Sequence, residues 1–202
     1  MIKWIIDVME LYGYIGIFLM MALENVFPPI PSEVILLFGG FMTTYSNMTA
    51  FGVFITATTG SLIGAMILYA IGSVFSVNRL EKVIDKWGKV LSLSKEDLWR
   101  AENWFQKYGY SAVLFCRMIP LVRSLISIPA GMSQMRFSLF VVFTMIGTCI
   151  WNVVLISTGV ILGVSWQDIL YYLNVYATIV YLFIGISIVL LVLIIIKRKY
   201  SK

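Results

Sequence analysis

The chain contains no histidine and only two cysteines among its 202 residues. Cys116 and Cys149 lie far apart in apolar surroundings, and neither belongs to a CxxC pair. Zinc sites and dithiol redox sites need such ligands in clusters. We therefore expect no metal, no redox chemistry and no cofactor.

Charged residues are also scarce. They make up 12% of the chain, whereas 60% of the residues are hydrophobic and the mean hydropathy is +0.94. Soluble domains carry about 25% charged and about 45–50% apolar residues, so we expect an integral membrane protein with a single domain. The net charge of +5 comes mostly from one connector and the C-terminal tail, which indicates membrane topology and no nucleic-acid partner.

Three long apolar runs predict transmembrane helices. They are Phe51–Val74, Phe137–Val164 and Val175–Ile196, and each exceeds the roughly 20 residues that cross a bilayer. The last run is followed by basic residues at 197–199, as is typical of a cytoplasmic end. The first apolar run of the chain, Gly13–Leu23, has no small-residue cleavage pattern behind it, so we take residues 1–202 as the mature protein.

Two shorter apolar runs end in charge and proline. Gly13–Leu23 spans only roughly 16 Å as a helix, about half of the hydrocarbon core, and Tyr108–Cys116 spans less. Proline removes a backbone donor and breaks a helix. We therefore predict two re-entrant hairpins, each entering to mid-depth and turning back. The prolines that break them are Pro28, Pro29 and Pro31 in the first hairpin and Pro120 and Pro129 in the second.

The distribution of basic residues gives the expected orientation. The connector 75–107 is rich in lysine and arginine, whereas the loops 43–50 and 165–174 have neither. The positive-inside rule then places the connector and the C-terminus in the cytoplasm and both loops outside. The segment between Lys107 and Arg136 must cross an even number of times, which a hairpin satisfies.

The chain also repeats itself weakly. YGYIGIF at 12–18 resembles YGYSAVL at 108–114, and Gly60 and Gly72 have the same spacing as Gly147 and Gly159. Because one span separates the copies, we predict an inverted repeat, an arrangement that places transporter sites between the two copies. The expected fold is all-α. The predicted parts of the single domain 1–202 are repeat one at 11–74, a connector with an amphipathic helix at 75–107, repeat two at 108–164 and a C-terminal span at 175–196.

Four charged residues fall inside these apolar regions. They are Glu24, Glu33, Arg117 and Arg123. A charge at the centre of a bilayer helix costs about 2.5–3.5 kcal/mol on insertion scales, so the four are expected to face a shared polar cavity rather than lipid. Guanidinium groups suit phosphate or carboxylate ligands, and a carboxyl group shielded from water can carry a proton. A buried salt-bridge cluster that only pins the hairpins together is the alternative.

Two motifs contain these charges and resemble a known family. ENVFPPIPSE at 24–33 and FCRMIPLVRSLISIPAGMSQM at 115–135 are similar to the signatures of the DedA family, also called the SNARE-associated or VTT-domain family. The resemblance extends from about residue 10 to 165. The loop between the two acids is shorter here than in some relatives, which carry aspartate at the second position, and this leaves the placement of Glu33 open.

The resemblance implies lipid translocation in the cytoplasmic membrane. Bacterial members include flippases for undecaprenyl phosphate, and a proton gradient is implied for some. By the resemblance, Arg117 and Arg123 are expected to bind the substrate phosphate, and Glu24 and Glu33 to couple protons. The expected partners are an anionic polyprenyl phosphate, membrane lipids and protons.

Other functions remain open from the sequence. The same residues would serve a proton-coupled transporter of a small ion or solute, a general phospholipid scramblase, or a structural protein held by a salt-bridge lock. A membrane lipid phosphatase is disfavoured because there is no histidine and no obvious nucleophile–base pair. Its only candidate hydroxyls, Ser124 and Ser127, are expected to bond the helix backbone. The exact substrate, the direction of transport and the oligomeric state, a homo-oligomer included, stay open.

Overall fold

The computed structural model describes residues 2–27, 30–75, 95–120 and 122–162. Within them all regular elements are helices, which confirms the expected all-α class. The helices are α1 (Ile2–Tyr12), α2 (Tyr14–Val26), α3 (Ser32–Met42), α4 (Ala50–Val74), α6 (Lys95–Cys116), α7 (Val122–Leu125), α8 (Ser127–Met132) and α9 (Phe137–Ile161). The predicted C-terminal span at 175–196, Pro28, Pro29 and most of the connector before α6 lie outside the described residues.

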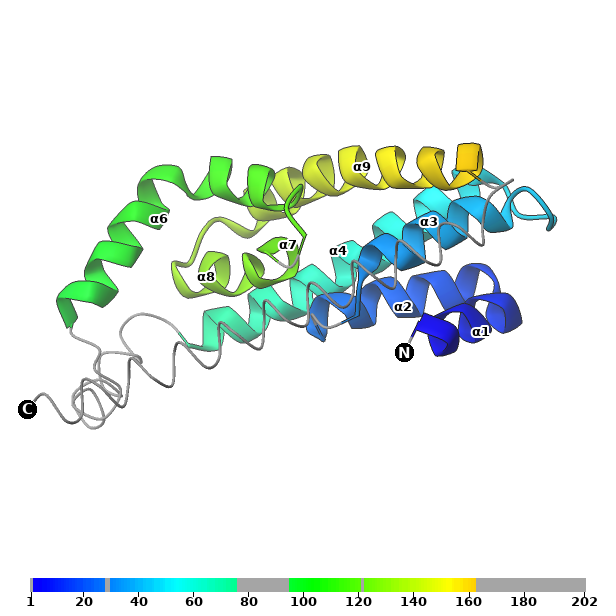
Figure 1. Cartoon of the computed structure of the whole chain (residues 1–202). Coiled ribbons are helices and arrows are strands. Elements are labelled where there is room, and N and C mark those ends of the chain that lie inside the picture. The colour runs from blue at the N-terminus through cyan, green and yellow to red at the C-terminus, as the bar shows by residue number, and fades with distance from the viewer. Residues whose placement is uncertain (1, 28–29, 76–94, 121, 163–202) are drawn as a thin grey trace, which may run out of the picture.

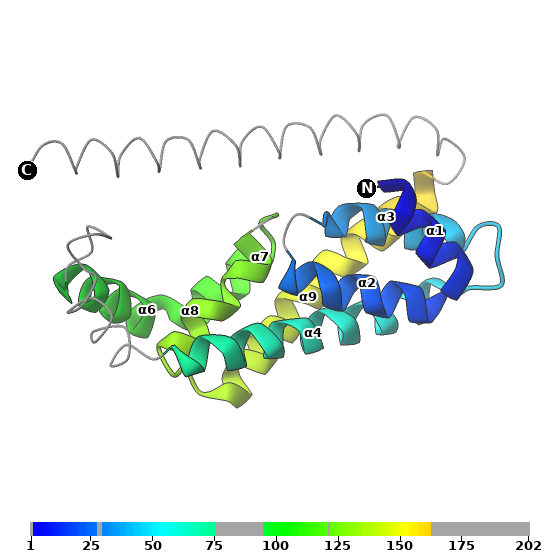
Figure 2. The same cartoon turned by 90° about the horizontal axis from the view of Figure 1, so that it is seen from below.

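Two long helices run through the whole described structure. Figures 1 and 2 show α4 and α9 extending between two groups of shorter helices, with α1, α2 and α3 at one end and α6, α7 and α8 at the other. α4 packs on α2 and α8, and α9 packs on α3 and α6. Each long helix therefore contacts a short helix from both groups, and the two groups are joined through them.

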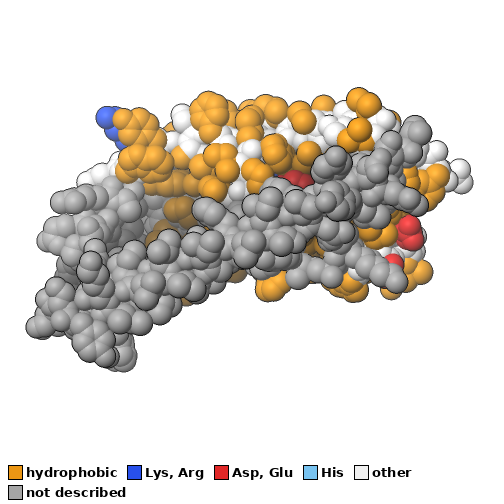
Figure 3. Space-filling model, viewed as in Figure 1, with side chains coloured by type: hydrophobic (Ala, Val, Ile, Leu, Met, Phe, Trp, Pro, Cys, Tyr) orange, Lys and Arg blue, Asp and Glu red, His pale blue; other side chains and the backbone are white. Residues whose placement is uncertain are grey.

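α4 and α9 have the length and surface of membrane helices. Each has 25 residues, or about 38 Å, which exceeds the hydrocarbon core. Both are apolar enough to cross a membrane, as predicted for two of the three spans. Apolar side chains are abundant on the described part of the face shown in Figure 3. The exposed ones on α4 include Ile55, Ile63, Ile67 and Ile71, and those on α9 include Ile146, Ile150, Val153 and Val154.

In the second group, α6 and α7 each end four residues before a proline. A proline ring clashes with the carbonyl group four residues earlier and cannot donate to it. α6 ends at Cys116, four residues before Pro120, and α7 ends at Leu125, four residues before Pro129. Pro129 itself lies in the first turn of α8, where its missing N–H leaves no helical bond unmade.

The first group breaks in a similar way. α2 ends at Val26, and Phe27, the residue before the prolines, has a non-helical ψ of 83°, because a following proline disfavours the helical conformation. Pro31 is the N-cap residue of α3. α2 and α3 are thus two short apolar helices of 13 and 11 residues, joined by a break.

Helix α6 runs across the predicted end of the connector. The sequence places the end of the connector at Lys107, where charged residues give way to apolar ones. In the structure α6 continues without interruption from Lys95 to Cys116. The predicted amphipathic helix and the first arm of the second hairpin therefore form a single helix, which Figure 1 shows to be bent. A change in polarity does not end a helix, and this segment contains no proline to do so.

Glycines allow the long helices to approach their partners closely. A Cβ atom built on Gly60 of α4 would lie 2.5 Å from the carbonyl oxygen of Phe18 in α2. A Cβ atom on Gly147 of α9 would lie 2.9 Å from the carbonyl oxygen of Leu114 in α6. Contacts this short leave no room for a side chain, so the α4–α2 and α9–α6 contacts, here called glycine seams, both depend on glycine.

The second pair of seams is tighter. A Cβ atom on Gly72 of α4 would lie 2.3 Å from the carbonyl oxygen of Ile128 in α8, and one on Gly159 of α9 would lie 2.2 Å from that of Leu37 in α3. The four glycines that have matching spacing in the two halves of the sequence thus all lie at contacts between helices.

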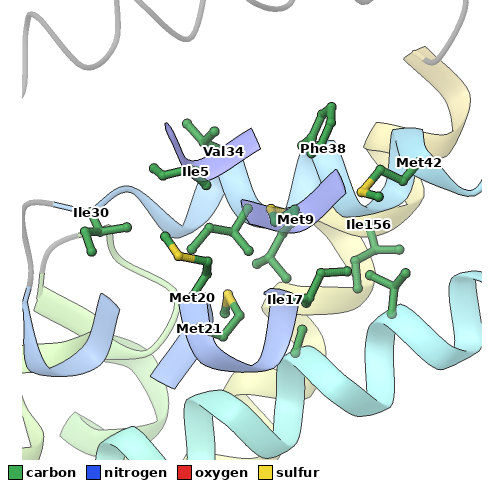
Figure 4. Close-up of a cluster of buried hydrophobic side chains, with 14 residues drawn as sticks. Ile5, Met9, Ile17, Met20, Met21, Ile30, Val34, Phe38, Met42 and Ile156 are labelled. Atoms are coloured by element: carbon green, nitrogen blue, oxygen red, sulfur yellow. The ribbon is translucent and has the colours of Figure 1, made fainter. Parts of the chain in front are cut away.

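Two apolar clusters form the described core, one in each group of helices. The first, shown in Figure 4, joins α1, α2 and α3 to α4 and α9 through residues such as Met9, Ile17, Phe38 and Ile156. The second joins α6 and α8 to α4 and α9, with Val113 and Phe140 fully buried. Neither cluster contains a charged residue.

Candidate functional site

A buried ion pair joins the two groups of helices. Arg123 Nε from α7 lies 3.9 Å from Glu24 Oε1 from α2, with the two side chains 1% and 4% exposed. The helix breaks described above determine where both residues lie. Glu24 occupies the last turns of α2, and Arg123 lies in the short helix that begins after the Pro120 break.

Arg117 belongs to the same network and is fully buried. Its Nη1 donates to Asn25 Oδ1 at 3.2 Å, and its Nη2 donates to Ser127 Oγ at 2.7 Å. Asn25 Nδ2 in turn donates to Glu24 Oε2 at 3.2 Å. Asn25 therefore bridges the carboxylate of Glu24 and the guanidinium group of Arg117.

The arginines keep donors that no other described group accepts. Arg123 Nη2 donates to Ser61 Oγ at 3.2 Å. Among the described residues, however, Arg117 Nε and the Nε and Nη1 atoms of Arg123 have no hydrogen-bond acceptor. A buried donor left unpaired costs about 1–3 kcal/mol, and more when it is charged. Guanidinium donors of this kind are able to bind acceptor oxygens such as those of carboxylate or phosphate groups.

Glu33 lies near the network but outside its direct contacts. It is in the first turn of α3 and is partly buried. Its charge acts on both Glu24 and Arg123, yet its Oε1 atom has no hydrogen-bond partner among the described groups. The structure thus brings Glu24, Arg117 and Arg123 into one network and leaves Glu33 beside it.

Sequence reasoning missed part of this site. Asn25 and Ser61 were not singled out, and Ser127 was expected to bond the helix backbone, whereas its hydroxyl accepts from Arg117. The sequence feature that could have identified Asn25 is its position next to Glu24, in the buried last turn of α2. Ser61 follows Gly60 in α4, where close packing brings small side chains near the neighbouring helices.

A second polar contact lies between the long helices. Asn152 Nδ2 of α9 donates to Thr58 Oγ1 of α4 at 3.0 Å, and both residues are buried. Within the described ranges no three His, Cys, Asp or Glu side chains gather into a group that could hold a metal ion. The chemistry of the described site is therefore that of guanidinium, carboxyl, amide and hydroxyl groups.

Comparison with known proteins agrees with this geometry. The sequence model of the VTT domain matches residues 30–161, which contain both arginines and Glu33. The chain belongs to the VTT-domain, or DedA, family. This confirms the resemblance noted from the two motifs. No solved structure matches the protein.

Relatives of this VTT-domain protein cover most of its length. An "Alkaline phosphatase-like protein" of Lactococcus lactis is 50% identical over 97% of this chain and 92% of its own. An "Undecaprenyl phosphate transporter A" of Staphylococcus aureus is 44% identical over 88% of both chains. The Bacillus subtilis protein of the same name is 37% identical over 78% of this chain and 75% of its own. Together with the apolar helices, these relatives identify a membrane protein of the transporter type.

Proposed function

We propose that the protein is a flippase that moves undecaprenyl phosphate, an anionic polyprenyl phosphate, across the cytoplasmic membrane. The observation that carries this proposal is the pair of buried arginines that retain unpartnered donors beside a single contacting carboxylate. The names of two relatives support the choice of lipid. The phosphate would occupy the polar cluster while the polyprenyl tail stays in the surrounding lipid.

Arg117 and Arg123 would bind the phosphate. A phosphate monoester offers several acceptor oxygens and up to two negative charges. The unpartnered donors on the two guanidinium groups match such a ligand in charge and in hydrogen bonding. A neutral ligand would leave the charge of the arginines uncompensated, which disfavours an uncharged solute.

Glu24 and Glu33 would couple transport to protons. With Glu24 ionised, Arg123 is partly neutralised by the carboxylate 3.9 Å away. A proton on Glu24 would remove this attraction and leave Arg123 available to the phosphate. Glu33 acts electrostatically on the same pair, so its protonation would remove a negative charge that attracts Arg123 and repels the Glu24 carboxylate.

The domain would be an inverted repeat of two opposed re-entrant hairpins. Support comes from the matching seams: α4 packs on α2 at Gly60 and on α8 at Gly72, while α9 packs on α6 at Gly147 and on α3 at Gly159. Each long helix thus uses its first glycine on its own repeat and its second on the other. The 13 residues of α2 span about 20 Å, which is too short to cross the bilayer.

The orientation completes the proposal. The connector 75–107 and the C-terminus would lie in the cytoplasm, so the first hairpin would enter from outside and the second from inside. Repeat one would cover 11–74, repeat two 108–164, and 175–196 would form the last span.

The decisive experiment compares arginine variants in cells that lack the protein. Arg117→Ala and Arg123→Ala should abolish recycling of undecaprenyl phosphate, measured as loss of the lipid phosphate from one membrane surface. Arg136→Ala is the matched control, because Arg136 is exposed at the start of α9. Normal recycling in a folded Arg117→Ala or Arg123→Ala variant would reject the proposal.

A lipid phosphatase is the second candidate, and the name of two Lactococcus lactis relatives, "Alkaline phosphatase-like protein", favours it. It would use the same arginines to hold the phosphate. Release of inorganic phosphate from undecaprenyl phosphate by the purified protein distinguishes the two. The flippase proposal expects no release above that of an Arg123→Ala variant.

A further inference from the structure

Each arginine of the site donates to one buried serine. Arg123 Nη2 donates to Ser61 Oγ of α4 at 3.2 Å, and Arg117 Nη2 donates to Ser127 Oγ of α8 at 2.7 Å. Both serines are fully buried. A serine hydroxyl group carries two lone pairs and one hydrogen. Accepting from an arginine uses one lone pair, so the hydrogen of each hydroxyl group is still available.

These two hydroxyl hydrogens have no acceptor within the described part of the chain. Ser73 of α4 and Ser133 at the end of α8 behave differently, because each donates to the carbonyl oxygen three residues earlier, at 2.8 Å and 3.3 Å. Such bonds to the local backbone are usual for serine in a helix. Ser61 and Ser127 make no bond of this kind among the described residues. A buried donor without an acceptor is unfavourable, so both hydroxyl groups suit an acceptor brought by a ligand.

The two serine oxygens lie close to the unpartnered nitrogens of the arginines. Neighbouring nitrogens of a planar guanidinium group are only about 2.3 Å apart, because two C–N bonds of about 1.33 Å meet at its central carbon. Ser127 Oγ is 2.7 Å from Arg117 Nη2, so it lies at most about 5 Å from the unpartnered Nε of Arg117. Ser61 Oγ is 3.2 Å from Arg123 Nη2, so it lies at most about 5.5 Å from the unpartnered Nε and Nη1 of Arg123.

One ligand oxygen can therefore reach a serine and its arginine together. Two hydrogen bonds of about 2.8 Å to the same oxygen atom span up to about 5.6 Å, which covers both separations. A hydroxyl group that accepts from a guanidinium group is also polarised by it and becomes a stronger donor. Phosphate oxygens are strong acceptors that carry negative charge. An ionised phosphate oxygen therefore fits these paired donors better than a neutral group does.

We propose that Ser61 and Ser127 bind the substrate phosphate, each by donating its hydroxyl hydrogen to a phosphate oxygen that also accepts from the adjacent arginine. This inference rests on the proposed function, because it takes the lipid phosphate as the ligand. The two serines belong to α4 and α8, so neutral donors from two helices join the guanidinium groups of the site. They add hydrogen bonds to the phosphate without adding positive charge.

The test measures the contribution of the phosphate group alone. The purified full chain in detergent is titrated with undecaprenyl phosphate and with undecaprenol, which has the same tail and a neutral hydroxyl group. The ratio of the two dissociation constants is the phosphate preference. Ser61→Ala and Ser127→Ala each remove one hydroxyl group. Ser73→Ala and Ser133→Ala are the matched controls, because these hydroxyl groups bond the local backbone.

Ser61→Ala and Ser127→Ala should each lower the phosphate preference by about tenfold or more, because each removes a hydrogen bond to a charged group. Their affinity for undecaprenol should match wild type, and both controls should keep the wild-type preference. An unchanged preference would overturn the assignment of that serine. An equal loss of affinity for the two lipids would also overturn it, because such a loss reports a general change in packing.

A second set of variants separates a direct contact from an effect through the arginine. Ser127→Ala is combined with Arg117→Ala, and Ser61→Ala is combined with Arg123→Ala. A serine that contacts the phosphate should lower the remaining preference further. A serine that only positions its arginine should add nothing, and this result would overturn the proposal.

Cysteine variants keep the proposal testable if an alanine variant does not fold. Ser61→Cys and Ser127→Cys nearly preserve the size of the side chain and leave only a weak S–H donor, so they should also lose phosphate preference. A wild-type preference in a folded cysteine variant would overturn the assignment of that serine.

The same titrations separate this inference from the proposed function. If Arg117→Ala and Arg123→Ala lose the phosphate preference while the serine variants keep it, the serine contacts are overturned and the phosphate site stands. If the wild type binds undecaprenol as tightly as undecaprenyl phosphate, both are overturned.

Discussion

Arg123 of α7 and Glu24 of α2 face each other across 3.9 Å in a region that is almost closed to solvent. The two residues are 99 positions apart in the sequence and belong to opposite groups of helices. Their pairing is therefore a tertiary link, and it joins the two parts of the molecule that the proposed mechanism requires to cooperate.

Breaking this pair should destabilise the protein. Glu24→Gln and Arg123→Gln should each lower the free energy of unfolding by about 3–5 kcal/mol, because each leaves a buried partner uncompensated. The double variant should cost less than the sum of the two. Unfolding in detergent measures this double-mutant cycle, and Glu10→Gln, at an exposed position, is the control. Additive effects would show that the two side chains do not interact.

Asn25, although uncharged, should contribute strongly to the affinity for the lipid phosphate. Asn25→Ala removes the acceptor for Arg117 and the donor to Glu24. Hydrogen bonds to charged groups contribute about 1.5–3 kcal/mol, so affinity for the lipid phosphate should fall by about tenfold or more. Titration of the purified variant measures this, and Asn47→Ala in the exposed loop should bind like wild type. Wild-type affinity in Asn25→Ala would remove this residue from the site.

The two tight glycine seams should respond alike. Gly72→Ala and Gly159→Ala each place a methyl group within 2.3 Å of a backbone carbonyl oxygen, so α4 must move from α8, or α9 from α3. We expect losses of about 1–3 kcal/mol in stability from each. Thermal unfolding in detergent measures them against Ala70→Ser on the exposed side of α4. Near-neutral effects of both glycine variants would contradict the close packing.

Opposed hairpins predict opposite labelling. In a background with Cys116 and Cys149 replaced by alanine, Asn47→Cys should react with a membrane-impermeant maleimide in intact cells. Gln134→Cys should react only after permeabilisation. Both positions are exposed in the structure, so access differs only by membrane side. Reaction of both from the same side would contradict the inverted arrangement.

Much of this architecture follows from the sequence because its causes are local. Long apolar runs determine α4 and α9, and proline determines where α6 and α7 end. The gathering of Glu24, Arg117 and Arg123 also follows, because the cost of exposing charge to lipid leaves only the interior. Which carboxylate contacts Arg123 does not follow, since it depends on how α2, α3 and α7 pack together.

The remaining parts of the site depend on small polar side chains. Asn25, Ser61 and Ser127 carry no charge, and a serine in an apolar helix most often bonds its own backbone. Only the three-dimensional position of the guanidinium groups shows that these residues are acceptors. The sequence does not indicate the continuity of α6 for a different reason: a change in polarity can mark the membrane surface, but it does not mark the end of a helix.

The uninterrupted course of α6 has a mechanical consequence. Its first turns are polar and its last turn leads directly into Arg117, about 33 Å away along the helix path. The helix therefore connects the predicted connector directly to Arg117. In the proposed mechanism, a tilt of this helix would move Arg117, the proposed phosphate ligand, relative to Asn25 of α2.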